Sequence, residues 1–268
     1  MNNYEAMEML KDNTILFNNG VVSQVMINRP NALNSVNIDI IKGIINIFSQ
    51  IENSKDVRAV TFWGAGSDAF SAGSEVSTLK NIRGLALTEY VTFGCQAMMS
   101  IEKCKVPVIA GVQGYCFGAG LEVALSSDII VATKEAKFGF PESELGMIPA
   151  FGGVARLLKR VGVGNAKKLL FTADLISAED ALKIGLIDEI SDEGKLTNRV
   201  DELAENISKR APLALQSSKK LINYYNNPES SALLQKEVEK FMRLSQSADY
   251  EEGIDAFLQK RSPNFTGR

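Results

Sequence analysis

The chain has 268 residues, of which 45% are hydrophobic, and this is enough apolar material for a large globular core. Its 29 basic and 32 acidic residues give a formal net charge of −3, which argues against a general nucleic-acid or membrane-binding surface. Because the sequence contains no histidine, Ser-His and Cys-His nucleophiles and His-ligated metal sites are excluded. Proton transfer near neutral pH must therefore use carboxylate, tyrosine, lysine or cysteine side chains.

The sequence carries no sign of export or of a membrane span. The N-terminal segment lacks an apolar core of signal-peptide length, and no stretch reaches the roughly 18 apolar residues that a membrane helix needs. We therefore expect a cytoplasmic protein. The three cysteines Cys95, Cys104 and Cys116 have no paired spacing, so we expect them to be buried small hydrophobic residues rather than disulfides or metal ligands.

The N-terminal half alternates predicted strands and helices. Strands over 14–17 and 21–27 flank Asn18-Asn19-Gly20, which favours a tight hairpin with positive φ in the turn. Isoleucines at helical spacing predict a helix over 37–51. The further elements expected in this half are strands over 57–63, 106–112, 128–133 and 137–140, and helices over 86–101, 119–127 and 153–161.

Beyond Gly164 the sequence favours helices. We expect them over 165–172, 177–184, 193–210, 212–225 and 228–260, with Ser177 as an N-cap and a break near Asp249 or Gly253. A strand over 186–190 interrupts them. The last helices carry an apolar stripe, which must pack on the core or on another subunit.

The most informative stretch is the glycine-rich segment after the strand over 106–112. Gly114, Gly118 and Gly120 lead into good helix formers, so a strand is followed by a turn and a short helix. The first amide groups of a helix have no partner within it, which makes this turn an anion-binding site.

Two carboxylates interrupt this apolar segment. Glu122 lies in the first turn of the expected helix, and Glu142 follows Pro141 in an expected loop. A carboxylate in such surroundings is costly unless it is paired or used in chemistry, so the two glutamates are a candidate acid/base pair. Each residue also has a purely structural explanation, since Glu122 could cap a helix N-terminus and Glu142 could be a surface loop residue.

Several segments, taken together and in order, resemble the crotonase, or enoyl-CoA hydratase/isomerase, superfamily. They are NRPNALN at 28–34, FSAG at 70–73, GYCFGAGLE at 114–122, PE at 141–142, IPAFGG at 148–153, SAEDALKIGLID at 177–188 and FLQKRSPNF at 257–265. The resemblance implies an α/β fold, a ClpP-like spiral of ββα units. It also implies a core domain over 1–195, a C-terminal helical trimerisation region over 196–268, and a homotrimer or a hexamer made of two trimers.

The resemblance further implies an enoyl-CoA hydratase that adds water reversibly to a 2-enoyl-CoA. Glu122 and Glu142 would share one water molecule, without a metal and without a cofactor other than the coenzyme A of the substrate. The backbone amides of Ser74 and Ala119 would hold the thioester oxygen. The residues that would contact the acyl group or coenzyme A are Ala32, Leu33, Ala72, Gly118, Phe257 and Lys260.

The sequence also departs from the family pattern. Asn31 and Ser77 stand where the family often has lysine, which should weaken the grip on coenzyme A phosphates. Ser143 replaces an apolar residue, so we expect a more polar pocket there. We expect a loop over 79–89 to set the length of the acyl chain that fits.

Three other functions remain open at this point. A Δ3,Δ2-enoyl-CoA isomerase can work with one carboxylate, and the missing lysines suit an enzyme or lyase acting on a carrier-protein thioester. A non-catalytic scaffold of the same fold would need neither glutamate.

Overall fold

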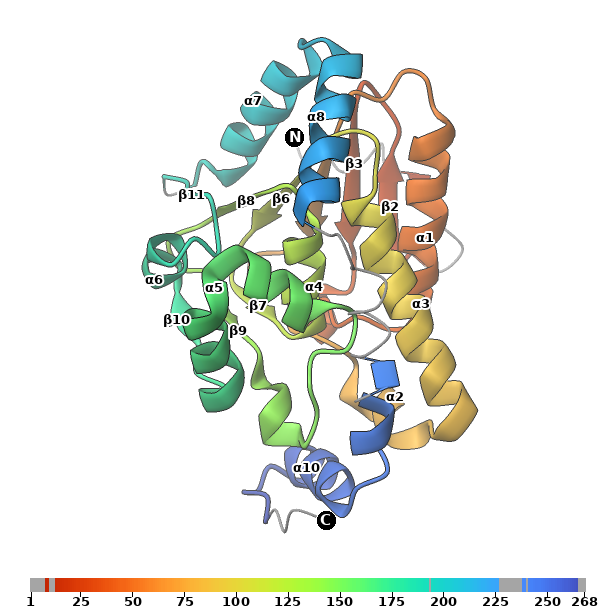
Figure 1. The fold of residues 1–268 in the computed structure, drawn as a ribbon, viewed down its shortest axis with the longest axis vertical. Helices are drawn as coiled ribbons and strands as arrows, with labels where there is room; N and C mark the ends of the chain where they lie inside the picture. The colour runs from red at the N-terminus through yellow and green to blue at the C-terminus, as the bar shows by residue number, and fades with distance from the viewer. Residues whose placement is uncertain (1–7, 10–12, 193, 227–237, 240, 265–268) are drawn as a thin grey trace.

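A computed structural model describes residues 8–9, 13–192, 194–226, 238–239 and 241–264. Within these residues, the strands form one larger mixed sheet and one smaller sheet, surrounded by helices (Figure 1). The larger sheet contains, in spatial order, β1 (Glu8–Met9), β2 (Ile15–Asn18), β3 (Val22–Ile27), β4 (Ala59–Gly64), β6 (Val108–Val112), β8 (Ile129–Ala132) and β11 (Glu189–Ile190). The smaller sheet contains β10 (Ile176–Ser177), β9 (Lys137–Gly139), β7 (Tyr115–Phe117) and β5 (Ala69–Ser71).

Helices connect and cover the two sheets. The α-helices are α1 (Ile38–Asn53), α2 (Val76–Asn81), α3 (Gly84–Glu102), α4 (Ala119–Ser126), α5 (Gly153–Thr172), α6 (Ala178–Lys183), α7 (Leu196–Ser208), α8 (Pro212–Asn226) and α10 (Ala248–Gln259). Two short 3₁₀ helices are η1 (Pro30–Ala32) and η2 (Pro141–Leu145). None of the helices in the described part of the chain is both long and apolar enough to cross a bilayer.

The chain winds through both sheets in successive turns. Strands β4, β6 and β8 of the larger sheet run parallel, and each is followed by a short strand of the smaller sheet, β5, β7 or β9. Helices follow each of these pairs before the next turn begins. This repeated strand, strand, helix order confirms the predicted spiral of ββα units.

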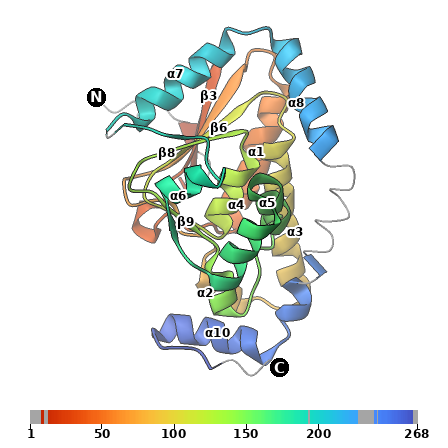
Figure 2. The same ribbon diagram turned by 60° about the vertical axis from the view of Figure 1, so that its left-hand side comes forward.

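The larger sheet is covered on both faces. Helices α1 and α3 lie side by side on one face, where they contribute to the main hydrophobic core (Figure 1). Helix α7 covers the other face, where Val200 joins Met26 and Trp63 in a second, smaller cluster. Figure 2 shows α7 and α8 at one end of the molecule and α10 at the opposite end.

Most predicted elements are confirmed within one to three residues at their ends. Ser177 caps α6 as expected, because its hydroxyl accepts a hydrogen bond from the Asp180 amide. The two helices expected on either side of Gly162 form α5 with a break at that residue, where φ is 74°. The three cysteines are buried, as predicted, and none of them forms a disulfide.

The hairpin is present, but its predicted turn is wrong. Strands β2 and β3 pair antiparallel up to Asn18 and Gln24, so the connection is longer than a tight turn. Gly20 is not in the left-handed region; instead its N–H and C=O both bond to the Ser23 hydroxyl. A local side-chain hydrogen bond therefore replaces the tight turn that Asn-Gly favours.

Other local expectations also differ from the structure. Residues 79–89 are not a loop, because α2 ends at Asn81 and α3 begins at Gly84. The strands β5 and β7 were not predicted, since each has only three residues beside glycines. Much of the expected helix over 228–260 lies outside the described residues; its last part is α10, which begins after the N-cap Ser247, beside the predicted break.

Helix α8 is anchored to the core by buried polar contacts. The Lys219 ammonium group, on a residue that is only 8% exposed, donates to Asp128 Oδ2 at 2.5 Å and to the Val106 carbonyl at 3.1 Å. The expected packing of the apolar C-terminal stripe on the core is seen further along, where Phe241 is part of the core and Val238 and Met242 pack against it. The division into domains over 1–195 and 196–268 stays a prediction.

Candidate active site

One cavity brings together residues that are far apart in the sequence. It has a volume of about 100 Å³ and a mostly apolar lining. Its polar groups come from the 72–74 segment, the turn before α4, and the two glutamates, Glu122 and Glu142. The apolar walls include Tyr90, Ile148, Phe151, Phe241 and Phe257. The structure therefore places the two sequence-predicted carboxylates in the same cavity.

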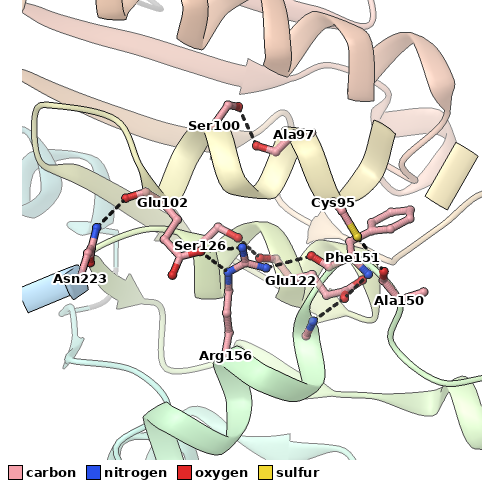
Figure 3. A network of polar contacts seen from close by, with 11 residues as sticks. Cys95, Ala97, Ser100, Glu102, Glu122, Ser126, Ala150, Phe151, Arg156 and Asn223 are labelled. Atoms are coloured by element: carbon pink, nitrogen blue, oxygen red, sulfur yellow. Dashed lines mark hydrogen bonds and ion pairs between the residues drawn. The ribbon is translucent and has the colours of Figure 1, made fainter. Parts of the chain in front are cut away.

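Glu122 is fixed within the core. It lies in the first turn of α4, as predicted, and the residue is 2% exposed. Its Oε1 atom accepts hydrogen bonds from the Phe151 amide at 2.8 Å and from the Gly153 amide at 2.7 Å (Figure 3). Two amide donors on one oxygen stabilise the ionised form of this carboxylate.

Glu142 has different surroundings. It lies in η2 rather than in the expected loop. The residue as a whole is half-buried, but its Oε2 atom is inaccessible to solvent and has no hydrogen-bond partner among the described residues. Burial raises the pKa of the Glu142 carboxyl group well above its usual 4.5, and the nearby Glu122 charge raises it further. Glu142 thus favours its protonated form at a pH where an exposed glutamate is ionised.

Glycines make room for both carboxylates. At Gly118, where φ is 48°, a methyl group would lie 2.7 Å from Glu142 Oε1. At Gly153 a methyl group would lie 2.7 Å from Glu122 Oε1 and 2.8 Å from Glu122 Cγ. Real side-chain carbons do not approach oxygen this closely, so the glycines of these two motifs are required by the position of the glutamates.

Of the two predicted oxyanion donors, Ser74 lines the cavity, and Ala119 directly follows Gly118, which also lines it. Ser74 forms a parallel bridge with Val36, in which the Gly73 carbonyl and the Glu75 amide make the two hydrogen bonds. The N–H of Ser74 therefore points away from Val36. Ala119 is the first residue of α4, and a methyl group on Gly73 would lie 3.7 Å from its amide nitrogen. The two chain segments that carry these amides thus lie side by side.

The predicted acyl and coenzyme A contacts separate into two groups. Ala72, Gly118 and Phe257 line the cavity. Three others do not line it: Ala32 is in η1, Leu33 follows it with φ 49°, and Lys260 ends α10 with φ 54°. The Leu33 carbonyl accepts a hydrogen bond from the amide of Ala72, a cavity residue, at 2.9 Å. The 32–33 segment therefore lies directly behind the cavity wall. The contacts themselves stay predictions.

The expected effect of Ser143 is wrong. Its side chain is exposed and does not line the cavity, because η2 turns it towards solvent. Glu144 is also exposed, as predicted. The residues of η2 that line the cavity are instead Pro141, Glu142 and Leu145.

The polar side chains that hold the 65–75 region in place were not predicted from the sequence. The Arg29 guanidinium pairs with Glu75 Oε1 at 2.6 Å and also donates to the Ser35 carbonyl. This pair holds the pKa of the Glu75 carboxyl group below its usual range. Asn34 Nδ2 donates to the carbonyls of Ala65 and Ala69. The NRPNALN motif was the available signal, but it did not indicate what these polar side chains bind.

Comparisons with known proteins identify the family of the chain. A family profile described as enoyl-CoA hydratase/isomerase matches residues 17–268. The short-chain-enoyl-CoA hydratase of Clostridium acetobutylicum is 38% identical over 93% of this chain and 96% of its own. The crotonyl-CoA hydratase of Syntrophomonas wolfei is 34% identical over 97% of this chain and all of its own.

Solved structures lead to the same family. The crystal structure of an enoyl-CoA hydratase from Mycobacterium avium subsp. paratuberculosis superimposes with a TM-score of 0.86 and 28% identity. It covers 94% of this chain and 98% of its own. From the family profile, the full-length relatives and the shared fold, we conclude that the chain belongs to the enoyl-CoA hydratase/isomerase, or crotonase, family.

Proposed function

We propose that this protein hydrates a short-chain 2-enoyl-CoA to the 3-hydroxyacyl-CoA, with Glu122 and Glu142 as its acid/base pair. Membership of the hydratase family and the names of the two relatives support an enoyl-CoA hydratase. The observation that carries the roles of the glutamates is their contrast within one cavity. Glu122 is an amide-bound carboxylate, and Glu142 is a buried carboxyl group with a raised pKa.

From this contrast we infer which glutamate accepts a proton and which one donates a proton. In hydration, Glu122 takes a proton from water while the water oxygen bonds to C3 of the substrate. The electrons of the C2=C3 bond move towards the thioester, and C2 of the resulting enolate takes the proton from Glu142. The proton that Glu122 took from water then passes to Glu142. One water molecule has now been added to the substrate, and both glutamates are back in their starting protonation states. A pair whose environments favour different protonation states is suited to this exchange.

The enolate intermediate carries a negative charge on the thioester oxygen, and hydrogen-bond donors must stabilise this charge. We assign this role to the backbone amides of Ser74 and Ala119. The orientation of the Ser74 bridge and the position of Ala119 at the start of α4 support the assignment. Preorganised donors of this kind are each worth roughly 10²–10³ in rate. No metal or cofactor beyond the coenzyme A of the substrate is needed for these steps.

The size of the cavity supports a short acyl chain. Its volume of about 100 Å³ is below the roughly 300–1,000 Å³ of pockets for drug-sized ligands. Aromatic side chains, among them Phe151 and Phe241, close its apolar part. The relatives described as short-chain and crotonyl-CoA hydratases favour the same conclusion.

We also propose a cytoplasmic homotrimer or hexamer. Exposed apolar side chains on α8, namely Leu213, Leu221 and Ile222, support an assembly that covers them. Sedimentation equilibrium of the purified protein tests the oligomeric state, and a monomer at micromolar concentration would contradict it.

The hydration is tested by following the loss of enoyl thioester absorbance with crotonyl-CoA. We expect turnover by the unaltered protein and a fall of about 10²–10⁴-fold in kcat for both Glu142→Gln and Glu122→Gln. Glu144→Gln, on the same short helix but exposed, is the matched control and should keep full activity. No loss of absorbance with crotonyl-CoA, together with conversion of a 3-enoyl-CoA that Glu122→Gln retains, would instead indicate a one-carboxylate isomerase. Equal rates with and without the coenzyme A 3′-phosphate would indicate a carrier-protein substrate.

A further inference from the structure

The Glu122 carboxylate is held by a loop that is itself held by two side chains. The loop is Ala150–Phe151–Gly152–Gly153, whose second and fourth amides donate to Glu122 Oε1. Its three successive carbonyl groups each accept a hydrogen bond from outside the loop. These donors determine where the two amides point, which makes them relevant to the reaction.

Cys95 fixes the first peptide group. Its thiol donates to the Ala150 carbonyl at 3.1 Å, from a residue of α3 that is 7% exposed (Figure 3). In a trans peptide the C=O and the following N–H point in opposite directions. Holding the Ala150 carbonyl towards Cys95 therefore directs the Phe151 amide to the other side, where Glu122 lies.

Residue 156 contacts the next two peptide groups, the first through the arginine side chain and the second through its backbone amide. Its guanidinium donates from Nη1 to the Phe151 carbonyl at 2.8 Å, and its backbone amide donates to the Gly152 carbonyl at 3.1 Å. The second contact directs the Gly153 amide to Glu122 by the same planar geometry. Gly152 has φ 96°, so the chain turns between the two amides in a conformation that favours glycine.

Glu102 neutralises the buried arginine. Arg156 is only 6% exposed, and its Nη2 and Nε atoms lie 2.7 and 3.2 Å from Glu102 Oε2. A buried guanidinium with this many fixed partners loses little further freedom when it binds the Phe151 carbonyl. The arrangement therefore links α3, α5 and the loop into one rigid support (Figure 3).

We propose that Cys95 and Arg156 are positioning residues for hydration, which hold the 150–153 loop so that two amides converge on Glu122. The inference rests on the proposed role of Glu122. Neither side chain lines the cavity, so we expect both to affect the chemical step through Glu122 rather than the binding of coenzyme A.

The test combines kinetics with hydrogen exchange on the full-length protein without ligand. For Arg156→Met we expect kcat with crotonyl-CoA to fall by about 10–100-fold, because a small displacement of a reacting group slows the chemical step strongly. KM should stay within about twofold of its value in the unaltered protein. The Phe151 amide should exchange faster, the Gly153 amide should change less because its peptide group keeps the hydrogen bond from the backbone amide of residue 156, and amides elsewhere should not change. Cys95→Ala should show the same pattern more weakly, and Cys95→Ser, which keeps a donor, should restore most of kcat.

Matched controls separate positioning from general stability. Arg160→Met removes another arginine from α5 that binds a carbonyl, that of Leu186, and an acid, Asp188. Cys104→Ala removes another buried cysteine close to α3. If either control lowered kcat as much as its partner variant, or if exchange rose throughout the protein, the proposal would be overturned.

Two further outcomes keep the test decisive. If Arg156→Met does not fold, the same measurements are made on Arg156→Lys, Cys95→Ala and Cys95→Ser. Unchanged amide exchange at Phe151 and Gly153 in all of these variants would reject the positioning role. Absence of hydration by the unaltered protein would reject the proposed function alone, because the exchange comparison does not depend on turnover.

Discussion

The two glutamates occupy one cavity, yet the regions that hold them differ in kind. Glu122 belongs to α4 inside the core, and hydrogen bonds from a braced loop fix its carboxylate. Glu142 belongs to the short helix η2, which is covered by α10 from the C-terminal end of the described chain. The two elements are in close contact. A methyl group on Gly253 of α10 would lie 2.4 Å from the Leu145 carbonyl carbon, and one on Gly146, which follows η2, would lie 2.6 Å from the backbone oxygen of Asp249.

This difference shows two ways of preparing a carboxyl group for proton transfer. Two amide hydrogen bonds hold the Glu122 carboxylate, whereas burial raises the pKa of the Glu142 carboxyl group. The first depends on the positions of a few atoms in the core. The second depends on how closely a C-terminal helix packs on a small element. The three predictions below act on one region at a time.

The largest effect is expected from Gly153→Ala in the rigid region. The added methyl group would lie 2.7 Å from Glu122 Oε1 and 2.8 Å from Pro149 Cβ, so the carboxylate must move away from its two amide donors. We expect kcat with crotonyl-CoA to fall by about 100-fold. Steady-state kinetics, with the melting temperature as a measure of folding, check this.

Gly164→Ala is the matched control for that substitution. Gly164 lies in the same helix α5, and nothing lies within 4 Å of a methyl group there. Activity should be unchanged, and the free energy of unfolding should rise by about 0.5–1 kcal/mol because alanine favours a helix. Equal losses of kcat in both variants would show that the Glu122 contact is not the cause.

An intermediate effect is expected from Gly253→Ala in the second region. The methyl group would separate α10 from η2, which admits water to Glu142 and lowers the pKa of its carboxyl group towards the usual value. We expect the alkaline limb of the kcat–pH profile to move to lower pH. Leu258→Ala, an exposed position on α10, should leave the profile in place. A profile unchanged by Gly253→Ala would mean that α10 does not keep Glu142 protonated.

The smallest effect is a gain in stability from Glu142→Gln. Because the folded-state pKa of Glu142 is raised, the unfolded chain releases this proton first as pH increases above about 4.5. The stability of the unaltered protein therefore falls between that pH and the folded-state pKa. We expect Glu142→Gln to melt at a higher temperature near pH 8, with the difference vanishing below about pH 4.

Glu144→Gln serves as the control in the same melting experiment. Its side chain is exposed on η2, so no pH-dependent difference is expected. A melting temperature of Glu142→Gln below that of the unaltered protein at pH 8 would contradict the account of Glu142 as a buried, costly carboxylate.

The sequence by itself determined the long elements and the chemistry that they carry. Isoleucine spacing predicted α1, apolar runs predicted β4, β6 and β8, and glycines before good helix formers placed Glu122 in the first turn of α4. The order of the family motifs then predicted the ββα spiral. These features are local, or they follow from a resemblance over the whole chain, so no contact had to be known in advance.

Only the tertiary structure decided how the site is held. Strands β5 and β7 exist because they pair with each other, and three residues carry too little periodicity to indicate a strand. The Cys95–Ala150 and Arg156–Glu102 contacts join residues 55 and 54 positions apart. The raised pKa of Glu142 depends on burial, which no sequence spacing records. Such properties arise when distant segments pack together, and for that reason the sequence predicted which carboxylates matter but not how each is prepared to act.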